Sequence, residues 1–156
     1  MVDVSGKAST LREALACGKV LMKPETVEAV ERGGMAKGDV LAVARVAGIM
    51  AAKKAGTLIP LCHPLEITGV DISFAGDRGK GEIAIQARVR TVGKTGVEME
   101  ALTAVSAAAL TIYDMCKSAD RGMVLSDIML IKKSGGRTGT YVREKKAGQG
   151  KKKGLR

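Results

Sequence analysis

The stretch GEIAIQARVRTVGKTGVEMEALTAVSAAALTIYDMCKS, residues 81–118, decides the fold. In its first part, apolar and polar residues alternate from Ile83 to Val89, as expected for a β-strand that buries one face. From about Glu98 to Ser118, the residues are mostly alanine and other good helix formers. The stretch therefore predicts a strand over residues 81–92, followed by the longest helix of the chain.

A hairpin is expected before this helix. Residues 65–74 form a second β-branched run, and the glycine-rich turn at residues 76–81 would join it to the strand that follows. After the long helix, residues 124–133 are expected to form the final strand.

The first part of the chain predicts a strand and two helices. Residues 9–22 are compatible with strand or helix, and only their last part favours a strand. A helix then begins at Pro24 and ends at Gly33. The second helix begins near Asp39, whose carboxylate can cap it, and ends at Gly56. Because apolar residues surround most of its circumference, we expect this second helix to be buried.

The order of these elements predicts the fold. Strand, two helices, strand, strand, helix and strand match an α+β, ferredoxin-like sandwich, an antiparallel sheet with helices packed on one face. We expect a single domain over residues 1–142. Residues 143–156 are rich in Lys and Gly and have almost no apolar side chains, so we expect them to form a basic, disordered tail.

The net charge of +10 raises the possibility of a nucleic-acid-binding module. The expected tail has seven basic residues and one acidic residue, a net of +6, which leaves only +4 for the rest. RNA-binding sheets of this type stack bases on exposed aromatics, and Phe74 is the only aromatic residue in either hairpin strand. A basic, ferredoxin-like nucleic-acid-binding module is therefore the alternative reading, and we expect no specific nucleic acid as partner.

Other features indicate a cytoplasmic protein with reduced thiols. No signal peptide and no apolar run of the ~18 residues needed to span a bilayer are present, so no membrane partner is expected. Cys17, Cys62 and Cys116 lack metal-ligand spacing, and we expect no structural zinc or other metal site.

Three segments carry candidate chemistry. His63 lies between two prolines, Pro60 and Pro64, which stiffen the backbone around it, and the odds between a catalytic and a structural histidine are about even. Residues 93–96 lead into the long helix, where Lys94 and free amide groups suit an anion, although a plain turn fits equally well. The cationic, glycine-rich residues 132–139 also suit phosphates.

Asp114 and Lys117 are three residues apart, which places them on one face of the long helix. The residues before them are almost wholly uncharged, so this part of the helix is expected to be buried. An acid and a base at the end of a buried helix are candidates for proton transfer, because each shifts the pKa of the other. Lys37 lies at the entrance of an earlier helix and adds another cation.

Together these segments resemble the cyclic pyranopterin monophosphate synthase family, also called molybdenum cofactor biosynthesis protein C. The stretches that carry the resemblance are residues 1–5, 37–40, 59–65, 94–104, 110–117 and 133–136. They extend from the start of the chain to near residue 139, and the block from residue 94 to 117 is long and ordered.

The resemblance implies a lyase with a small-molecule substrate. Members of the family convert 3′,8-cyclo-7,8-dihydro-GTP to cyclic pyranopterin monophosphate and release pyrophosphate. They have a ferredoxin-like fold and assemble as hexamers, trimers of dimers, with the site at a subunit interface. This rearrangement changes no redox state, so general acids and bases suffice and no cofactor is expected.

The resemblance also implies roles for individual residues. The implied substrate-contacting positions are Leu61, Cys62, His63, Met99 and Glu100. The implied proton-transfer groups are Asp114 and Lys117, with Lys37, Glu98 and Lys133 beside them and Asp3 as a further member.

The long helix itself predicts a shared site. Glu98 and Asp114 are separated by sixteen residues, which corresponds to roughly 24 Å along the helix axis. Because one small substrate cannot touch both groups from a single helix, the two would have to come from different chains, as a two-fold axis allows.

Overall fold

The computed structural model describes residues 1–144 and contains one antiparallel sheet with helices on one side. The elements are β1 (Thr10–Leu21), α1 (Pro24–Glu31), α2 (Val40–Lys53), α3 (Ala55–Leu58), β2 (Ile67–Asp77), β3 (Glu82–Gly93), α4 (Glu98–Cys116), β4 (Val124–Ser134) and β5 (Tyr141–Val142). The strands lie in the order β2-β3-β1-β4-β5, and all neighbours are antiparallel. The predicted α+β, ferredoxin-like sandwich is confirmed.

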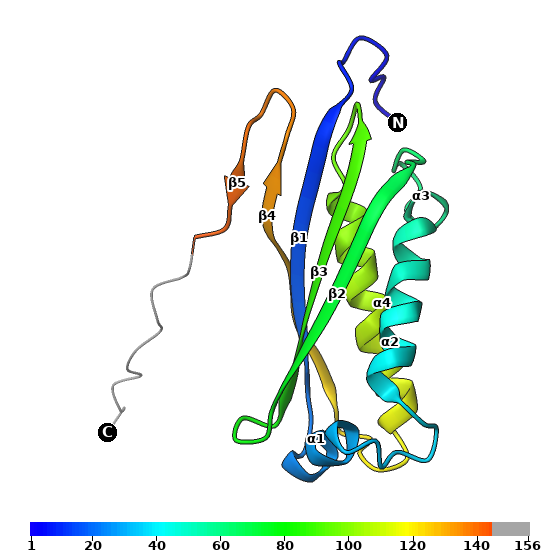
Figure 1. Cartoon of the computed structure of the whole chain (residues 1–156), viewed down its shortest axis with the longest axis vertical. Helices are drawn as coiled ribbons and strands as arrows, with labels where there is room; N and C mark the ends of the chain where they lie inside the picture. Colours follow the sequence, from blue (N-terminus) through cyan, green and yellow to red (C-terminus); the bar gives the residue numbers. More distant parts are fainter. Residues whose placement is uncertain (145–156) are drawn as a thin grey trace, which may run out of the picture.

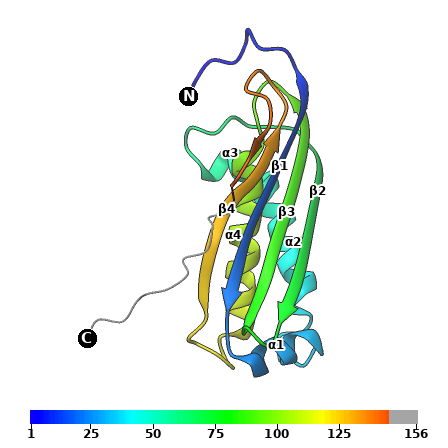
Figure 2. The same cartoon turned by 90° about the vertical axis from the view of Figure 1, so that its left-hand side faces the viewer.

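Helices α2 and α4 pack side by side on one face of the sheet, while α1 lies across one end of it (Figures 1 and 2). Alternation along the strands explains this layering. In β1, Ala14, Ala16 and Val20 are fully buried, and Ala16 pairs with Ala87 of β3. The predicted 76–81 turn joins β2 to β3, and the Asp39 carboxylate accepts a hydrogen bond from the Ala42 N–H at 3.0 Å, which confirms the helix cap.

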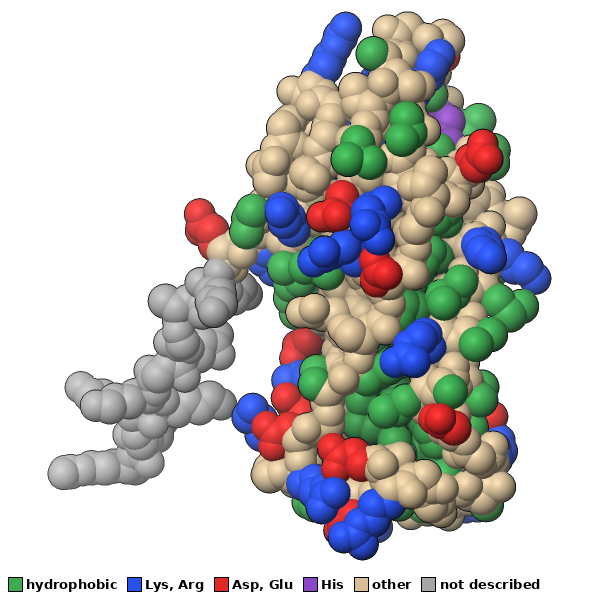
Figure 3. All heavy atoms as spheres, in the orientation of Figure 1, with side chains coloured by type: hydrophobic (Ala, Val, Ile, Leu, Met, Phe, Trp, Pro, Cys, Tyr) green, Lys and Arg blue, Asp and Glu red, His purple; other side chains and the backbone are tan. Residues whose placement is uncertain are grey.

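Helix α2 is only partly buried, so the expectation of a fully buried helix is wrong. Its buried side consists of residues spaced four apart, Val40 and the small residues Ala44, Gly48 and Ala52. These pack against β2 and α4, whereas Val43, Val46 and Met50 are 45–57% exposed. Figure 3 shows hydrophobic side chains along the side of the molecule that α2 forms. A count of apolar residues around a helix cannot distinguish a side that packs against the rest of the chain from an apolar side that the chain leaves exposed.

Gly48 is the point of closest approach between α2 and its neighbours. A Cβ atom there would collide with the Ile72 side chain and lie 3.0 Å from the Ala104 carbonyl oxygen of α4. We expect Gly48→Val to lower the free energy of unfolding by about 2–3 kcal/mol, because the added methyl groups have no space. Urea unfolding measures this change, and Gly6→Val is the control, since a Cβ atom added at Gly6 would have no contact within 4 Å. Equal stability of the two variants would show that the helices separate without strain.

Two further features differ from the sequence-based expectation. β1 is a strand from Thr10 onward, and its whole length pairs with β3, which removes the ambiguity over residues 9–22. β4 is not the last strand, because Tyr141 and Val142 pair with Lys133 and Lys132 of β4. A two-residue strand is too short to leave a pattern in the sequence. Residues 145–156, most of the expected basic tail, lie outside the described residues.

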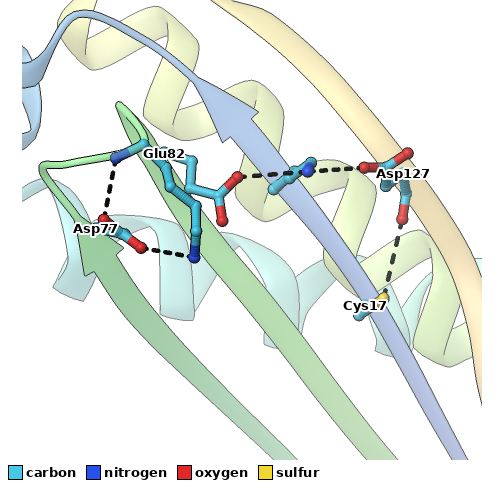
Figure 4. A network of polar contacts seen from close by, with 6 residues as sticks. Cys17, Asp77, Glu82 and Asp127 are labelled. Atoms are coloured by element: carbon cyan, nitrogen blue, oxygen red, sulfur yellow. Dashed lines mark hydrogen bonds and ion pairs between the residues drawn. The ribbon is translucent and has the colours of Figure 1, made fainter. Parts of the chain in front are cut away.

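The outer face of the sheet carries paired charges of both signs (Figure 4). Lys19 lies 3.3 Å from the Glu82 carboxylate and 2.9 Å from that of Asp127. At the adjoining turn between β2 and β3, Lys80 lies 2.8 Å from Asp77. Phe74 is half-buried, and Arg45 of α2 lies 5.6 Å from the centre of its ring. Phe74, the aromatic residue of the hairpin, is therefore covered by Arg45 and not free to stack on a base.

Candidate active site

A glycine-rich pocket of about 510 Å³ lies at the end of the sheet where α4 begins. Its walls come from residues 7–13, residues 94–98 and residues 133–138, so the two glycine-containing segments predicted as anion sites meet here. Five cationic side chains and two carboxylates line it: Lys7, Arg12, Lys94, Lys133, Arg137, Glu13 and Glu98. Free backbone amides and an excess of cations suit a phosphate-bearing ligand.

Arg12 belongs to this pocket, although the sequence analysis missed it. Its guanidinium donates to the carbonyl groups of Gly93 at 3.2 Å and Lys94 at 3.4 Å. Gly136, which has a φ of 77°, lets the loop approach Arg12 so closely that a Cβ atom would collide with the guanidinium. The sequence pattern did contain one indication of this position. Arg12 lies two residues before the buried Ala14, so both side chains point to the same face of β1.

Two acids near the start of α4 lie in different environments. Glu98 is part of the pocket wall, and its carboxylate accepts a hydrogen bond from the Lys133 ammonium at 2.8 Å. Glu100 is only 2% exposed, and burial raises the pKa of its carboxyl. Its Oε1 atom lies 3.6 Å from Cys62 Sγ, whereas Oε2 has no hydrogen-bond partner among the described residues. Burial and the Glu100 charge raise the pKa of the Cys62 thiol, so it stays protonated at neutral pH.

The connector between the two prolines lies at the same end of the molecule. Cys62 and His63 are half-buried, while Leu61 is exposed and Met99 lies at the surface of α4. His63 Nε2 lies 2.7 Å from the carbonyl oxygen of Val2. Next to Val2, the Asp3 carboxylate accepts hydrogen bonds from the Ser5 N–H at 2.8 Å and the Ser5 hydroxyl at 3.0 Å, which lower the pKa of Asp3.

A second pocket, the Asp114 pocket, lies at the other end of α4 and has a volume of about 380 Å³. The Asp114 carboxylate is held between two ammonium groups, Lys37 at 2.7 Å and Lys117 at 2.8 Å. The hydrogen bonds from Lys117 and then Lys37 lower the pKa of Asp114 to about 2, and the bond to Asp114 raises that of Lys117. Both groups are therefore fully charged at neutral pH. Tyr113, Ser118 and Arg121 complete the lining, and Arg121 is a residue that sequence analysis missed.

The uncharged part of α4 is buried as expected, whereas the side chains of Asp114 and Lys117 at its end are 56% and 53% exposed. They occupy the solvent side of the last turns of α4, while Met115 and Cys116 face inward. The uncharged stretch before them packs against the sheet and α2, and this burial does not extend around the helix to the polar face.

The candidate residues thus form two groups rather than one. Lys37 lies beside Asp114 and Lys117 as expected, but Glu98 and Lys133 lie at the opposite end of α4. From the sixteen residues between Glu98 and Asp114, the two groups are about 24 Å apart along the helix. Figure 1 shows the two ends of α4 at opposite ends of the molecule.

Metal ligands and membrane-spanning segments were also sought in residues 1–144. This part of the chain contains no group of three or more His, Cys, Asp or Glu side chains that could hold a metal ion. Its cysteines, Cys17, Cys62 and Cys116, are free thiols. None of its helices combines the length and the apolar character required to cross a membrane.

Comparisons with known proteins agree on one family. The MoaC family matches residues 1–136. Cyclic pyranopterin monophosphate synthase of Heliobacterium modesticaldum is 63% identical over 144 residues, which cover 92% of this chain and 91% of the relative. The synthase of Thermoanaerobacter pseudethanolicus is 64% identical over the same shares of the two chains. The Clostridium acetobutylicum synthase is 59% identical over 143 residues, which cover 92% of this chain and 89% of the relative.

The fold and these relatives define an α+β enzyme. It is a lyase of molybdenum cofactor biosynthesis, and its substrate is a small-molecule pterin precursor. The chain belongs to the MoaC family, which confirms the resemblance noted in its sequence.

Proposed function

We propose that this enzyme converts 3′,8-cyclo-7,8-dihydro-GTP to cyclic pyranopterin monophosphate and releases pyrophosphate, by general acid and base catalysis. The observation that carries the proposal is the Asp114 carboxylate held between the Lys37 and Lys117 ammonium groups at the mouth of a pocket. The relatives that are 58–64% identical to this chain bear the name of this synthase. The reaction opens and closes rings and cleaves a phosphoanhydride. Each step requires proton transfer and none requires oxidation or reduction.

The triphosphate of the substrate would lie in the glycine-rich pocket. Lys94, Lys133 and Arg137 offer three positive charges there, and Gly135 and Gly136 bring backbone amides close to a ligand. The same groups would stabilise negative charge on the departing pyrophosphate. Glu98, which pairs with Lys133, would keep that ammonium oriented until the substrate arrives.

Lys117 would act as a proton donor in the Asp114 pocket. With its pKa raised by Asp114, it is an ammonium at neutral pH, and Asp114 is a poor base there. The pair therefore supplies a positioned acid, and its conjugate base forms only after the proton has been given up. The proposed substrate contacts are Leu61, Cys62, His63, Met99, Glu100 and Asp3.

A complete site would require two chains. The glycine-rich pocket and the Asp114 pocket are about 24 Å apart on one α4 helix, too far for one small substrate to bridge. A two-fold axis that pairs antiparallel helices would bring the glycine-rich pocket of each chain next to the Asp114 pocket of its partner. Val43, Val46 and Met50 form an exposed apolar side of α2, which is typical of a surface that packs against another chain. We propose a hexamer built as a trimer of dimers.

Turnover of the cyclised nucleotide tests this function. The protein incubated with 3′,8-cyclo-7,8-dihydro-GTP should produce a pterin that becomes fluorescent after oxidation. GTP itself is the control, and it should give no signal because its guanine ring has not been cyclised. Fluorescence from neither nucleotide, with folded protein present, would contradict the proposed substrate.

A further inference from the structure

The segment before β1 is tied to the candidate site by two hydrogen bonds. The Val2 carbonyl oxygen lies 2.7 Å from His63 Nε2, and the Lys94 ammonium donates to the Ser5 carbonyl at 2.8 Å. Figures 1 and 2 both show the N-terminal segment beside the chain that follows α3. The turn in which Asp3 accepts the Ser5 N–H stiffens the segment between these two anchors.

The contact with Val2 determines where His63 carries its proton. A carbonyl oxygen can only accept a hydrogen bond, so Nε2 must be the nitrogen that bears hydrogen. In a neutral imidazole the other nitrogen, Nδ1, then has a free lone pair and accepts protons. His63 Nδ1 makes no hydrogen bond to any residue of the described chain.

We propose that the Val2 carbonyl is a positioning group of the site, which holds His63 as the Nε2–H tautomer and leaves Nδ1 as the proton acceptor. The proposal rests on the proposed function in one respect, that His63 contacts the substrate. It gives the Val2 carbonyl a role in catalysis without any contact with the reacting atoms.

The other acids proposed to lie near the substrate do not fill the role of proton acceptor. Asp114 is ionised but bound by two ammonium groups, and Glu98 is bound by Lys133. Glu100 is only 2% exposed, and its Oε1 atom lies 3.6 Å from Cys62 Sγ. The proposed reaction requires an acceptor as well as the donor Lys117, and the lone pair of His63 Nδ1 supplies one.

Nitrogen NMR tests the tautomer directly, because His63 is the only histidine in the chain. Protein labelled with ¹⁵N-histidine is examined without substrate at about pH 8.5. Two variants are compared with it. One lacks residues 1–4, which removes the Val2 carbonyl. The other, Asp3→Asn, keeps that carbonyl and an oxygen that accepts the Ser5 N–H, and so serves as the matched control.

The proposal predicts a proton-bearing, slowly exchanging Nε2 and a proton-free Nδ1 in the intact protein and in Asp3→Asn. The truncated protein should lose the slow exchange and distribute its proton over both nitrogens. Three results would overturn the proposal: a proton on Nδ1 in the intact protein, an unchanged Nε2–H signal after truncation, or loss of that signal in Asp3→Asn. A proton on Nδ1 is sought in the intact protein, so this result can contradict the proposal even if the truncated chain misfolds.

Kinetics add a second readout. General acid–base groups typically contribute 10²–10⁴-fold, so truncation should lower kcat by about tenfold or more while KM changes by less than about threefold. A rise in KM alone would assign the segment to substrate binding and contradict the positioning role. Because the NMR measurement uses no substrate, an intact protein that fails to turn over the cyclised nucleotide would count against the proposed function only.

Discussion

Replacement of Lys117 by alanine should lower turnover of the cyclised nucleotide by about 10²–10⁴-fold, the usual contribution of a general acid. Asp114→Asn should have a similar effect, because the carboxylate raises the pKa of Lys117 and holds its ammonium 2.8 Å away. Both side chains are more than half exposed, so the fold should survive and circular dichroism should be unchanged. The measurement is kcat with saturating substrate.

The chain offers a matched control for this pair. Lys80 and Asp77 have the same spacing in sequence, the same 2.8 Å separation and an exposed location, but they lie at the turn between β2 and β3. Lys80→Ala should therefore leave kcat unchanged. The double variant Asp114→Asn with Lys117→Ala should lose much less than the product of the single losses, since groups that act as a unit are not additive. Strictly additive losses, or near-normal single variants, would make the pair a structural ion pair.

The pH dependence follows from the same pKa shifts. The pKa of Asp114 is lowered to about 2, so its interaction with Lys117 is present above about pH 4 and disappears only as the pH falls toward 2. The pKa of Lys117 is raised, so deprotonation in alkali occurs above its ordinary value. Any loss of kcat/KM between about pH 5 and 8 must therefore come from a group other than this pair.

Mixing two inactive variants, Glu98→Ala and Asp114→Asn, should restore activity. In a mixed dimer, one of the two sites receives native Glu98 from one chain and native Asp114 from the other. With random assembly, about a quarter of all sites would be complete, against almost none in either variant alone. This large gain follows from the separation of about 24 Å between the two groups on one α4 helix.

The control for this experiment uses two variants of one pocket, Asp114→Asn and Lys117→Ala. Both groups come from the same chain, so in a mixed dimer each site keeps one defect and activity should not return. Mixed assemblies must be demonstrated in both experiments, for example with a tag on one partner. Failure of Glu98→Ala and Asp114→Asn to complement in proven mixed assemblies would contradict a site shared between chains.

The fold was predictable because local patterns and tertiary packing agree along most of the chain. Alternation from Ile83 to Val89 marks the strand that lies between β2 and β1, and Asp39 caps α2 as its position suggested. The burial of α2 was overestimated because Val43, Val46 and Met50 are apolar without being covered by this chain. β5 was missed because two residues carry no periodicity.

The arrangement of the candidate site residues was only partly predictable. Spacing placed Asp114 beside Lys117, and the residue count along α4 correctly separated Glu98 from Asp114. Contacts between segments far apart in sequence were not predicted, as the bond between His63 and Val2 and the approach of Arg12 to Gly136 illustrate. The exposure of Asp114 could not be predicted from the sequence either, because its apolar neighbours in sequence lie on the other side of the helix.

The stoichiometry of the reaction tests the proposed function most directly. Purified protein is incubated with 3′,8-cyclo-7,8-dihydro-GTP, and the pterin formed and the pyrophosphate released are quantified in the same sample. The account predicts that both appear in equal amounts and that Lys117→Ala suppresses both together. Release of inorganic phosphate in place of pyrophosphate, or a substrate that stays unchanged with folded protein, would contradict it.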